Sequence, residues 1–130
     1  MGYGAFMSAT NNRSAAIKTF VTDVSCMYEN GGDGSHLEYF DNLLIGAGSR
    51  YPDSGRIYIE AKNSGSCFFE SAQFKLKVTD NSNGAIIGTV SFVDSSANWT
   101  VASNTNPDVL NVNIDNSGNQ ATISVTVAAS

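Results

Sequence analysis

Apolar and polar residues alternate along most of this chain with a period of two. In residues 56–62, Ile57, Ile59 and Ala61 fall on one side, and the residues between them are charged or carry a hydroxyl group. The same period recurs in residues 74–80, 110–115 and 121–128. Because successive side chains of a strand point to opposite faces, this period predicts strands with one buried and one exposed face.

Further segments are rich in apolar and β-branched residues, and clusters of Gly, Asn, Asp and Ser separate them: 16–28, 36–46, 66–71, 85–93 and 98–103. No segment combines an apolar stripe of helical period with helical length. About eight or nine short strands at near-regular spacing predict an all-β fold, an antiparallel β-sandwich of Greek-key or jelly-roll type. At 130 residues the chain fits one such domain, spanning 1–130.

Two turns share the order Asp-Asn-Ser shortly before a glycine, at residues 80–84 and 115–118. An EF-hand loop needs a glycine at its sixth position and a bidentate glutamate at its twelfth, and neither segment has them. Hairpin turns use Asp, Asn and Gly for positive φ angles and for side-chain hydrogen bonds to the backbone. Both segments are therefore predicted to be turns, and no metal site is expected.

The charge of the chain bears on its partners. The net charge is -5, and the seven Lys and Arg residues are scattered along the sequence. Nucleic-acid binding requires clustered basic side chains that neutralise phosphates, so no nucleic-acid partner is expected. Charged residues make up only 15% of the chain, against about a quarter in a typical soluble protein. This profile, with many Asn, Ser and Thr, is common in proteins that act outside cells.

Targeting signals bear on the location of the protein. The first residues lack a charged region followed by an apolar one, so no signal peptide is expected in this chain. The longest aliphatic run is Leu43 to Ile45, so no transmembrane segment is expected either. Two alternatives stay open: the protein is made in the cytosol, or a leader has been removed. The composition described above, not the targeting signals, leads to the prediction of an extracellular or surface-acting location.

The two cysteines leave alternatives open. Cys26 ends one predicted strand and Cys67 begins another, so a disulfide between them and a pair of buried free thiols are equally acceptable. With one histidine and no C-x-x-C motif, the cysteines cannot form a zinc site alone. An immunoglobulin domain is not expected, because Trp99 follows both cysteines instead of lying between them.

Catalysis has little support in the sequence. His36, the only histidine, lies near the acidic residues Asp33, Glu38 and Asp41, which together suit a general base. The alternative is a histidine at the start of a strand beside solvated acids. No nucleophile elbow, phosphate-binding loop or H-E-x-x-H motif is present. The chain is therefore predicted to be non-enzymatic, with no catalytic residue and no cofactor.

Binding is the function that the sequence favours. Loops of a β-sandwich commonly carry recognition, and residues 29–36 and 48–55 combine aromatic, planar polar and acidic side chains. An exposed ring beside such groups suits a sugar. A lectin-like module that binds a glycan or another cell-surface ligand is predicted, with the two loops meeting around an aromatic-floored hollow at one end of the sandwich. The candidate ligand-binding residues are Asp33, His36, Arg50, Tyr51, Asp53, Asn98 and Trp99.

Alternatives remain for two of these residues and for the function. Trp99 also suits a core position, and the ring of Tyr51 also suits packing over the end of the sandwich. Low charge and long alternating strands also suit a structural subunit of an appendage, coat or fibre, which would assemble as a homo-oligomer through strand edges. The third hypothesis is a membrane-damaging β-protein, because insecticidal and cytolytic proteins can combine an extracellular-like composition with the absence of a signal peptide.

Overall fold

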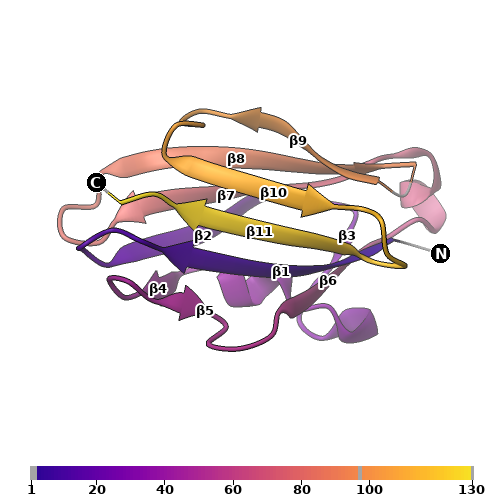
Figure 1. Cartoon of the computed structure of the whole chain (residues 1–130). Coiled ribbons are helices and arrows are strands. Elements are labelled where there is room, and N and C mark those ends of the chain that lie inside the picture. Colours follow the sequence, from indigo (N-terminus) through magenta and orange to yellow (C-terminus); the bar gives the residue numbers. More distant parts are fainter. Residues whose placement is uncertain (1–2, 97, 130) are drawn as a thin grey trace.

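The computed structural model describes residues 3–96 and 98–129, which form two β-sheets packed face to face (Figure 1). This arrangement confirms the predicted all-β sandwich, with eleven strands instead of eight or nine. The first sheet has the order β10 (Leu110–Asp115), β11 (Ala121–Val127), β1 (Gly4–Asn11), β6 (Ile57–Ala61) and β3 (Met27–Tyr28), and β5 (Arg50–Tyr51) also pairs with β1. The second sheet has the order β4 (Leu43–Ile45), β2 (Ile17–Ser25), β7 (Ala72–Asp80), β8 (Ile86–Ser95) and β9 (Asn98–Asn104).

Strand β1 lies in the middle of the first sheet, although the sequence pattern did not predict it. It runs antiparallel to β6 and parallel to β11, with Ala5 opposite Ala121 and Asn11 opposite Val127. The predicted antiparallel sandwich therefore contains one parallel pair. The parallel pairing brings the first and last strands of the chain side by side, as Figure 1 shows in indigo and yellow.

The core lies between the sheets and follows the two-residue period of the strands. On β7, Phe74, Leu76 and Val78 are fully buried, and the lysines between them are exposed or partly exposed. Thr79, which follows Val78, is also buried. Phe74 stacks on Phe92 of β8, with 4.9 Å between the ring centroids. One cluster of buried side chains joins both sheets, so the alternation read from the sequence does place the apolar face inward.

Two segments predicted as strands contain 3₁₀ helices. Residues 36–46 contain η2 (Leu37–Phe40) before the short strand β4, and residues 66–71 fall mostly within η3 (Gly65–Phe69). In η2 the buried residues Leu37 and Phe40 are three positions apart, which is the repeat of a 3₁₀ turn and not of a strand. A third helix, η1 (Gly32–Gly34), lies in the loop after β3.

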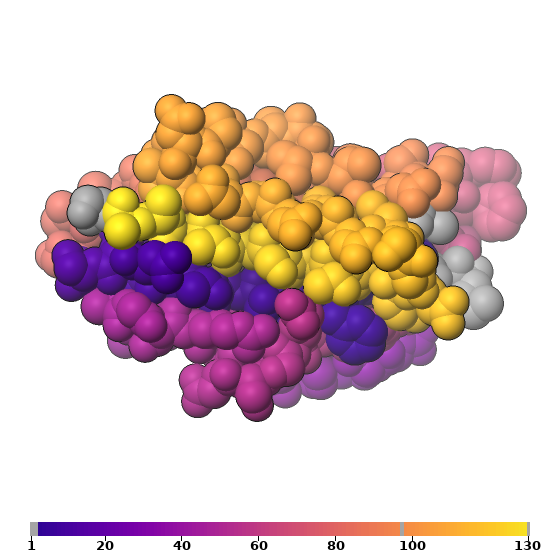
Figure 2. Space-filling model, in the orientation of Figure 1, coloured from indigo at the N-terminus to yellow at the C-terminus, as the bar shows by residue number. Residues whose placement is uncertain are grey.

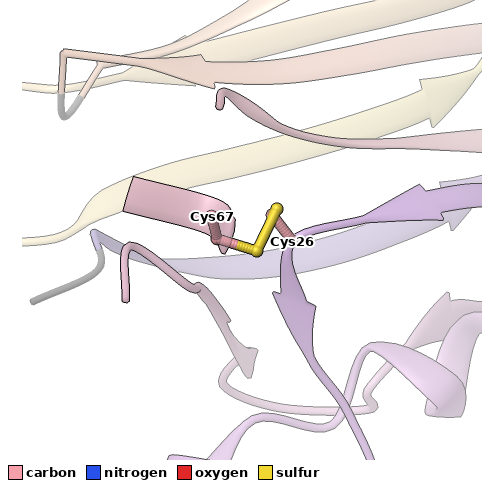
Figure 3. Close-up of a disulfide and its surroundings, with 2 residues drawn as sticks. All are labelled: Cys26 and Cys67. Carbon is pink, nitrogen blue, oxygen red and sulfur yellow. A yellow bond between two sulfur atoms is a disulfide. The ribbon is translucent and has the colours of Figure 1, made fainter. Parts of the chain in front are cut away.

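The cysteines form a disulfide, which settles the alternative left open by the sequence. Cys26, between β2 and β3, is joined to Cys67 of η3, and their Cα atoms are 5.6 Å apart (Figure 3). The bond ties η3 to the point where the chain leaves the second sheet for the first.

The two Asp-Asn-Ser segments are turns, as predicted. Asp80 accepts hydrogen bonds from the backbone N–H and the hydroxyl group of Ser82, and Asp115 accepts one from the backbone N–H of Ser117. These bonds hold the pKa of each aspartate below its usual value. The carboxylates are therefore engaged with their own turns.

Within the described part of the chain, no helix is long and apolar enough to cross a membrane.

Candidate functional site

The loop that carries Asp33 and His36 is fixed to β6. The backbone N–H of His36 donates to the carbonyl of Tyr58, and the hydroxyl group of Ser35 accepts a hydrogen bond from the backbone N–H of Glu60. Asp33 is exposed in η1, and its charge is one of the causes that raise the pKa of Tyr58, although burial contributes more. The loop is therefore held beside the outer face of the first sheet.

The ring of His36 has partners on two sides. Its Nδ1 lies 2.7 Å from Oε2 of Glu38, and its face stacks on Tyr39 with 4.3 Å between the ring centroids. Burial raises the pKa of the Glu38 carboxyl, but hydrogen bonds from His36 and from the backbone N–H of Asn30 outweigh burial and keep the pKa below its usual value. Tyr39 is 44% exposed, so this stack presents an aromatic surface to solvent.

The second predicted loop is held by its own arginine. Arg50 donates through Nη1 to the carbonyl of Pro52 and through Nη2 to the carbonyl of Gly55, so its guanidinium group stabilises the turn that carries Asp53. Tyr51 is half-buried and contacts the edge of the buried Phe40 ring, with 5.6 Å between centroids. Part of the Tyr51 ring is therefore packed against the sandwich, as the alternative interpretation expected.

The helix η2 connects these two loops along one side of the sandwich. His36 precedes η2, and Phe40 at its end touches Tyr51. Residues 29–36 and 48–55 therefore share a side, below β1 in Figure 1, instead of one end of the sandwich. The two hollows described below lie elsewhere in the molecule.

Asn98 and Trp99 lie on the opposite side from these loops, on edge strand β9 at the top of Figure 1. Trp99 is 0% exposed, and its ring packs against Phe74 with 5.8 Å between centroids. Its inclusion among the ligand-binding residues is a misassignment, because the large apolar ring completes the core. Asn98 is exposed but does not share a surface with Asp33, His36 or Arg50.

The outer face of the first sheet carries a regular array of hydroxyl and amide groups. Strand register places the side chains in three rows across β10, β11 and β1, which lie side by side in Figure 2. The spacing is about 4.8 Å between strands and about 6.7 Å between rows. We call this array the polar face, and its rows are Asp115, Thr122 and Phe6; Asn113, Ser124 and Ser8; and Asn111, Thr126 and Thr10.

The polar face continues into the predicted loops at both ends of β1. Its first row extends from Phe6 to Tyr58 of β6, and its third row extends from Thr10 to Arg50 of β5. Ser8 is only 4% exposed, so the middle row is accessible mainly at Ser124 and Asn113. Asp33, beside Tyr58, and Arg50, beside Thr10, are thus the predicted residues that join this surface.

An aromatic pair closes one end of the polar face. Phe6 is 41% exposed, and its ring centroid lies 5.2 Å from that of Tyr58. The Tyr58 hydroxyl group donates to Glu60, and burial, followed by this bond, raises the Tyr58 pKa. A Cβ atom on Gly4 would lie 2.6 Å from Cζ of Tyr58, so only glycine lets the ring rest there.

Sequence reasoning missed this face for an identifiable reason. Residues 121–128 were predicted to form an alternating strand, but the partners of this strand on β1 were not recognised, because β1 was not predicted. Register between strands that are far apart in sequence cannot be read from local alternation. The Ser-Thr-Asn content of the outward positions was the available signal.

Basic residues are less scattered in space than along the sequence. Lys18, Lys75 and Lys77 all fall on the outer face of the second sheet, and Lys77 lies over the ring of Phe20 at 4.9 Å. A hollow of about 510 Å³ opens on this sheet near Lys75, whose ammonium group pairs with Asp23 at 3.1 Å. This face is the positively charged side of an otherwise acidic protein.

Among residues 3–96 and 98–129, no group of three or more His, Cys, Asp or Glu side chains is arranged to hold a metal ion. The chemistry available at the polar face is thus hydrogen bonding, mostly by neutral groups with Asp115 and Arg50 at its margins, together with contact by aromatic rings. No protein-family model matches the sequence, and no curated protein matches it either.

Proposed function

We propose that the protein is a non-enzymatic recognition module that binds carbohydrate through the polar face of its first sheet. The observation that carries this proposal is the lattice of hydroxyl and amide groups that ends on the Phe6–Tyr58 pair. Sugar hydroxyl groups both donate and accept hydrogen bonds, as do the side chains of Thr, Ser and Asn. The apolar face of a sugar ring suits contact with an exposed aromatic ring.

The charge distribution supports a neutral ligand. Thr122, Ser124, Thr126, Asn111 and Asn113 carry no charge, and the lysines of the second sheet lie on the outer face of the other sheet. The charged groups at the margins of the polar face are of both signs, with Asp115 and Asp33 near its first row and Arg50 beside its third. An extended glycan chain is the ligand best matched to a flat array, whereas an ion would require charged or converging groups.

The disulfide supports an extracellular or surface-acting location. Disulfides form and persist in oxidising compartments and are rare in the cytosol. The bond between Cys26 and Cys67 thus agrees with a protein that meets glycans outside a cell.

A glycan array followed by titration calorimetry tests the proposal. We expect at least one glycan to bind, with affinity lowered at least tenfold by Phe6→Ala and by Ser124→Lys, which would place a charge in the middle of the face. Leu44→Ala is the matched control, because Leu44 is 57% exposed but lies on the second sheet. Absence of any bound glycan, or affinity unchanged by both substitutions, would refute the proposal.

The second candidate is a structural subunit that assembles through a strand edge. Strand β9 is at the edge of the second sheet, and its sequence, Asn98 to Asn104, contains neither a charged residue nor proline. Such an edge can pair with another chain. Sedimentation over a range of concentrations separates the candidates: growth of oligomers that Val101→Lys prevents supports assembly, and a monomer at all concentrations rules it out.

A further inference from the structure

A hollow at the disulfide end of the sandwich contains a buried carboxylate. Its volume is about 290 Å³. It lies at the end of the sandwich where β8 and η3 come close to each other, at the right of Figure 1. Asp94 of β8 lines the hollow and is only 8% exposed, so its side chain is more than nine-tenths buried. Other side chains of the wall are Tyr3, Lys62, Phe68 and Glu70.

The Asp94 carboxylate is not neutralised from within the described structure. Its Oδ1 atom has no hydrogen-bond partner among the described residues. The ammonium group of Lys62, the basic side chain of the wall, instead lies 5.3 Å from the centroid of the Tyr28 ring. A buried carboxylate oxygen without a hydrogen-bond partner is costly, and each such group calls for an explanation, of which a functional role is one.

The remaining walls favour a cation. Phe68 is 65% exposed and forms an aromatic side of the hollow, which the disulfide of the adjacent Cys67 holds in place. Burial, followed by the charges of Asp94 and Asp115, raises the pKa of Tyr3, so both carboxylates lie close enough to act on its hydroxyl group. A carboxylate beside aromatic rings is the combination that attracts an organic ammonium group.

We propose that this hollow binds a small organic ammonium ion, with its N–H groups donating to Asp94 and its cationic centre beside the rings of Phe68 and Tyr3. A metal ion is a poorer match, since hard cations need several oxygen ligands and the described residues offer no such cluster. This inference does not depend on the carbohydrate proposal, because the polar face and the hollow use different residues.

Two probes of equal shape test the role of charge. Benzylammonium chloride and neutral benzyl alcohol are titrated into the protein, and binding is followed by calorimetry and by NMR shift changes at Phe68 and Tyr3. We expect benzylammonium to bind at least tenfold more tightly than benzyl alcohol. Equal affinity for the two probes, or no saturable binding of benzylammonium, would overturn the proposal.

Three variants locate the site. Asp94→Asn should reduce benzylammonium affinity at least tenfold, to the level of the alcohol, and Phe68→Ser should reduce it severalfold without affecting folding, because Phe68 is largely exposed. Asp108→Asn removes the same charge from an exposed loop at the other end of the molecule and should leave affinity unchanged. Full affinity in Asp94→Asn would overturn the proposal, as would an equal loss in Asp108→Asn.

Discussion

Replacement of Asp94 by asparagine should make the stability of the protein less dependent on pH. Burial raises the pKa of Asp94 from 3.8 to about 6. Between these two values the folded state binds the proton more tightly than the unfolded state does, so stability falls as pH rises through this window. A tenfold change in proton affinity corresponds to about 1.4 kcal/mol, so above pH 7 the charged carboxylate costs the fold at most about 3 kcal/mol.

The asparagine amide does not titrate, so the comparison isolates this cost. The unfolding free energy of Asp94→Asn minus that of the unsubstituted protein is the quantity to measure. This difference should increase by up to about 3 kcal/mol between pH 4 and pH 7.5. Urea unfolding, followed by circular dichroism at several pH values, measures the difference. Asp108→Asn is the control and should show no such trend, since Asp108 is exposed. A difference for Asp94→Asn that is constant with pH would refute the reasoning.

Three further outcomes follow from the structure. A Cys26→Ala, Cys67→Ala protein lacks the disulfide, and its unfolding free energy should be lower by about 4 kcal/mol, the loop-closure entropy expected for a 41-residue separation. Urea unfolding measures this difference, and an unchanged midpoint would contradict the prediction. Gly4→Ala should displace the ring of Tyr58 and weaken glycan binding at least fivefold, as measured by calorimetry. Unchanged affinity would show that the Tyr58 ring does not contribute to glycan binding. Trp99→Ala should lower the unfolding free energy by about 3–5 kcal/mol, because the ring is fully buried. In the unsubstituted protein, acrylamide should quench Trp99 fluorescence only weakly, and strong quenching would indicate an exposed, ligand-contacting ring.

The sheets were predictable where side chains of contrasting polarity alternate, and not elsewhere. Strands β6, β7, β10 and β11 carry clear alternation and were predicted within a few residues. Strand β1 was missed because its inward residues include Ala5 and Ala9, which are weak hydrophobic signals, while the large Phe6 points outward. A central strand can be inconspicuous in sequence when small residues suffice to fill its part of the core.

The candidate site was predicted only in part, for the same reason. Asp33 and Arg50 were identified from loop composition, and the structure places both beside the polar face. Trp99 was misassigned because a large aromatic residue near a turn looks the same in sequence whether it faces solvent or the core. The buried carboxylate of Asp94 could not be recognised, since nothing local in the sequence shows that it lines one hollow together with Cys67 and Phe68 of η3.

The central position of β1 has a consequence for how the protein is made. Gly4 and Gln120, joined by a hydrogen bond, are 116 residues apart, so the first sheet cannot close until β11 has left the ribosome. Until then β1 lacks its neighbour β11, so this edge of the first sheet stays unpaired. Such long-range pairing slows folding and favours aggregation of the incomplete chain. Synthesis of this protein should therefore benefit from chaperones that shield nascent strands, and deletion of β1 should be more damaging than its modest sequence suggests.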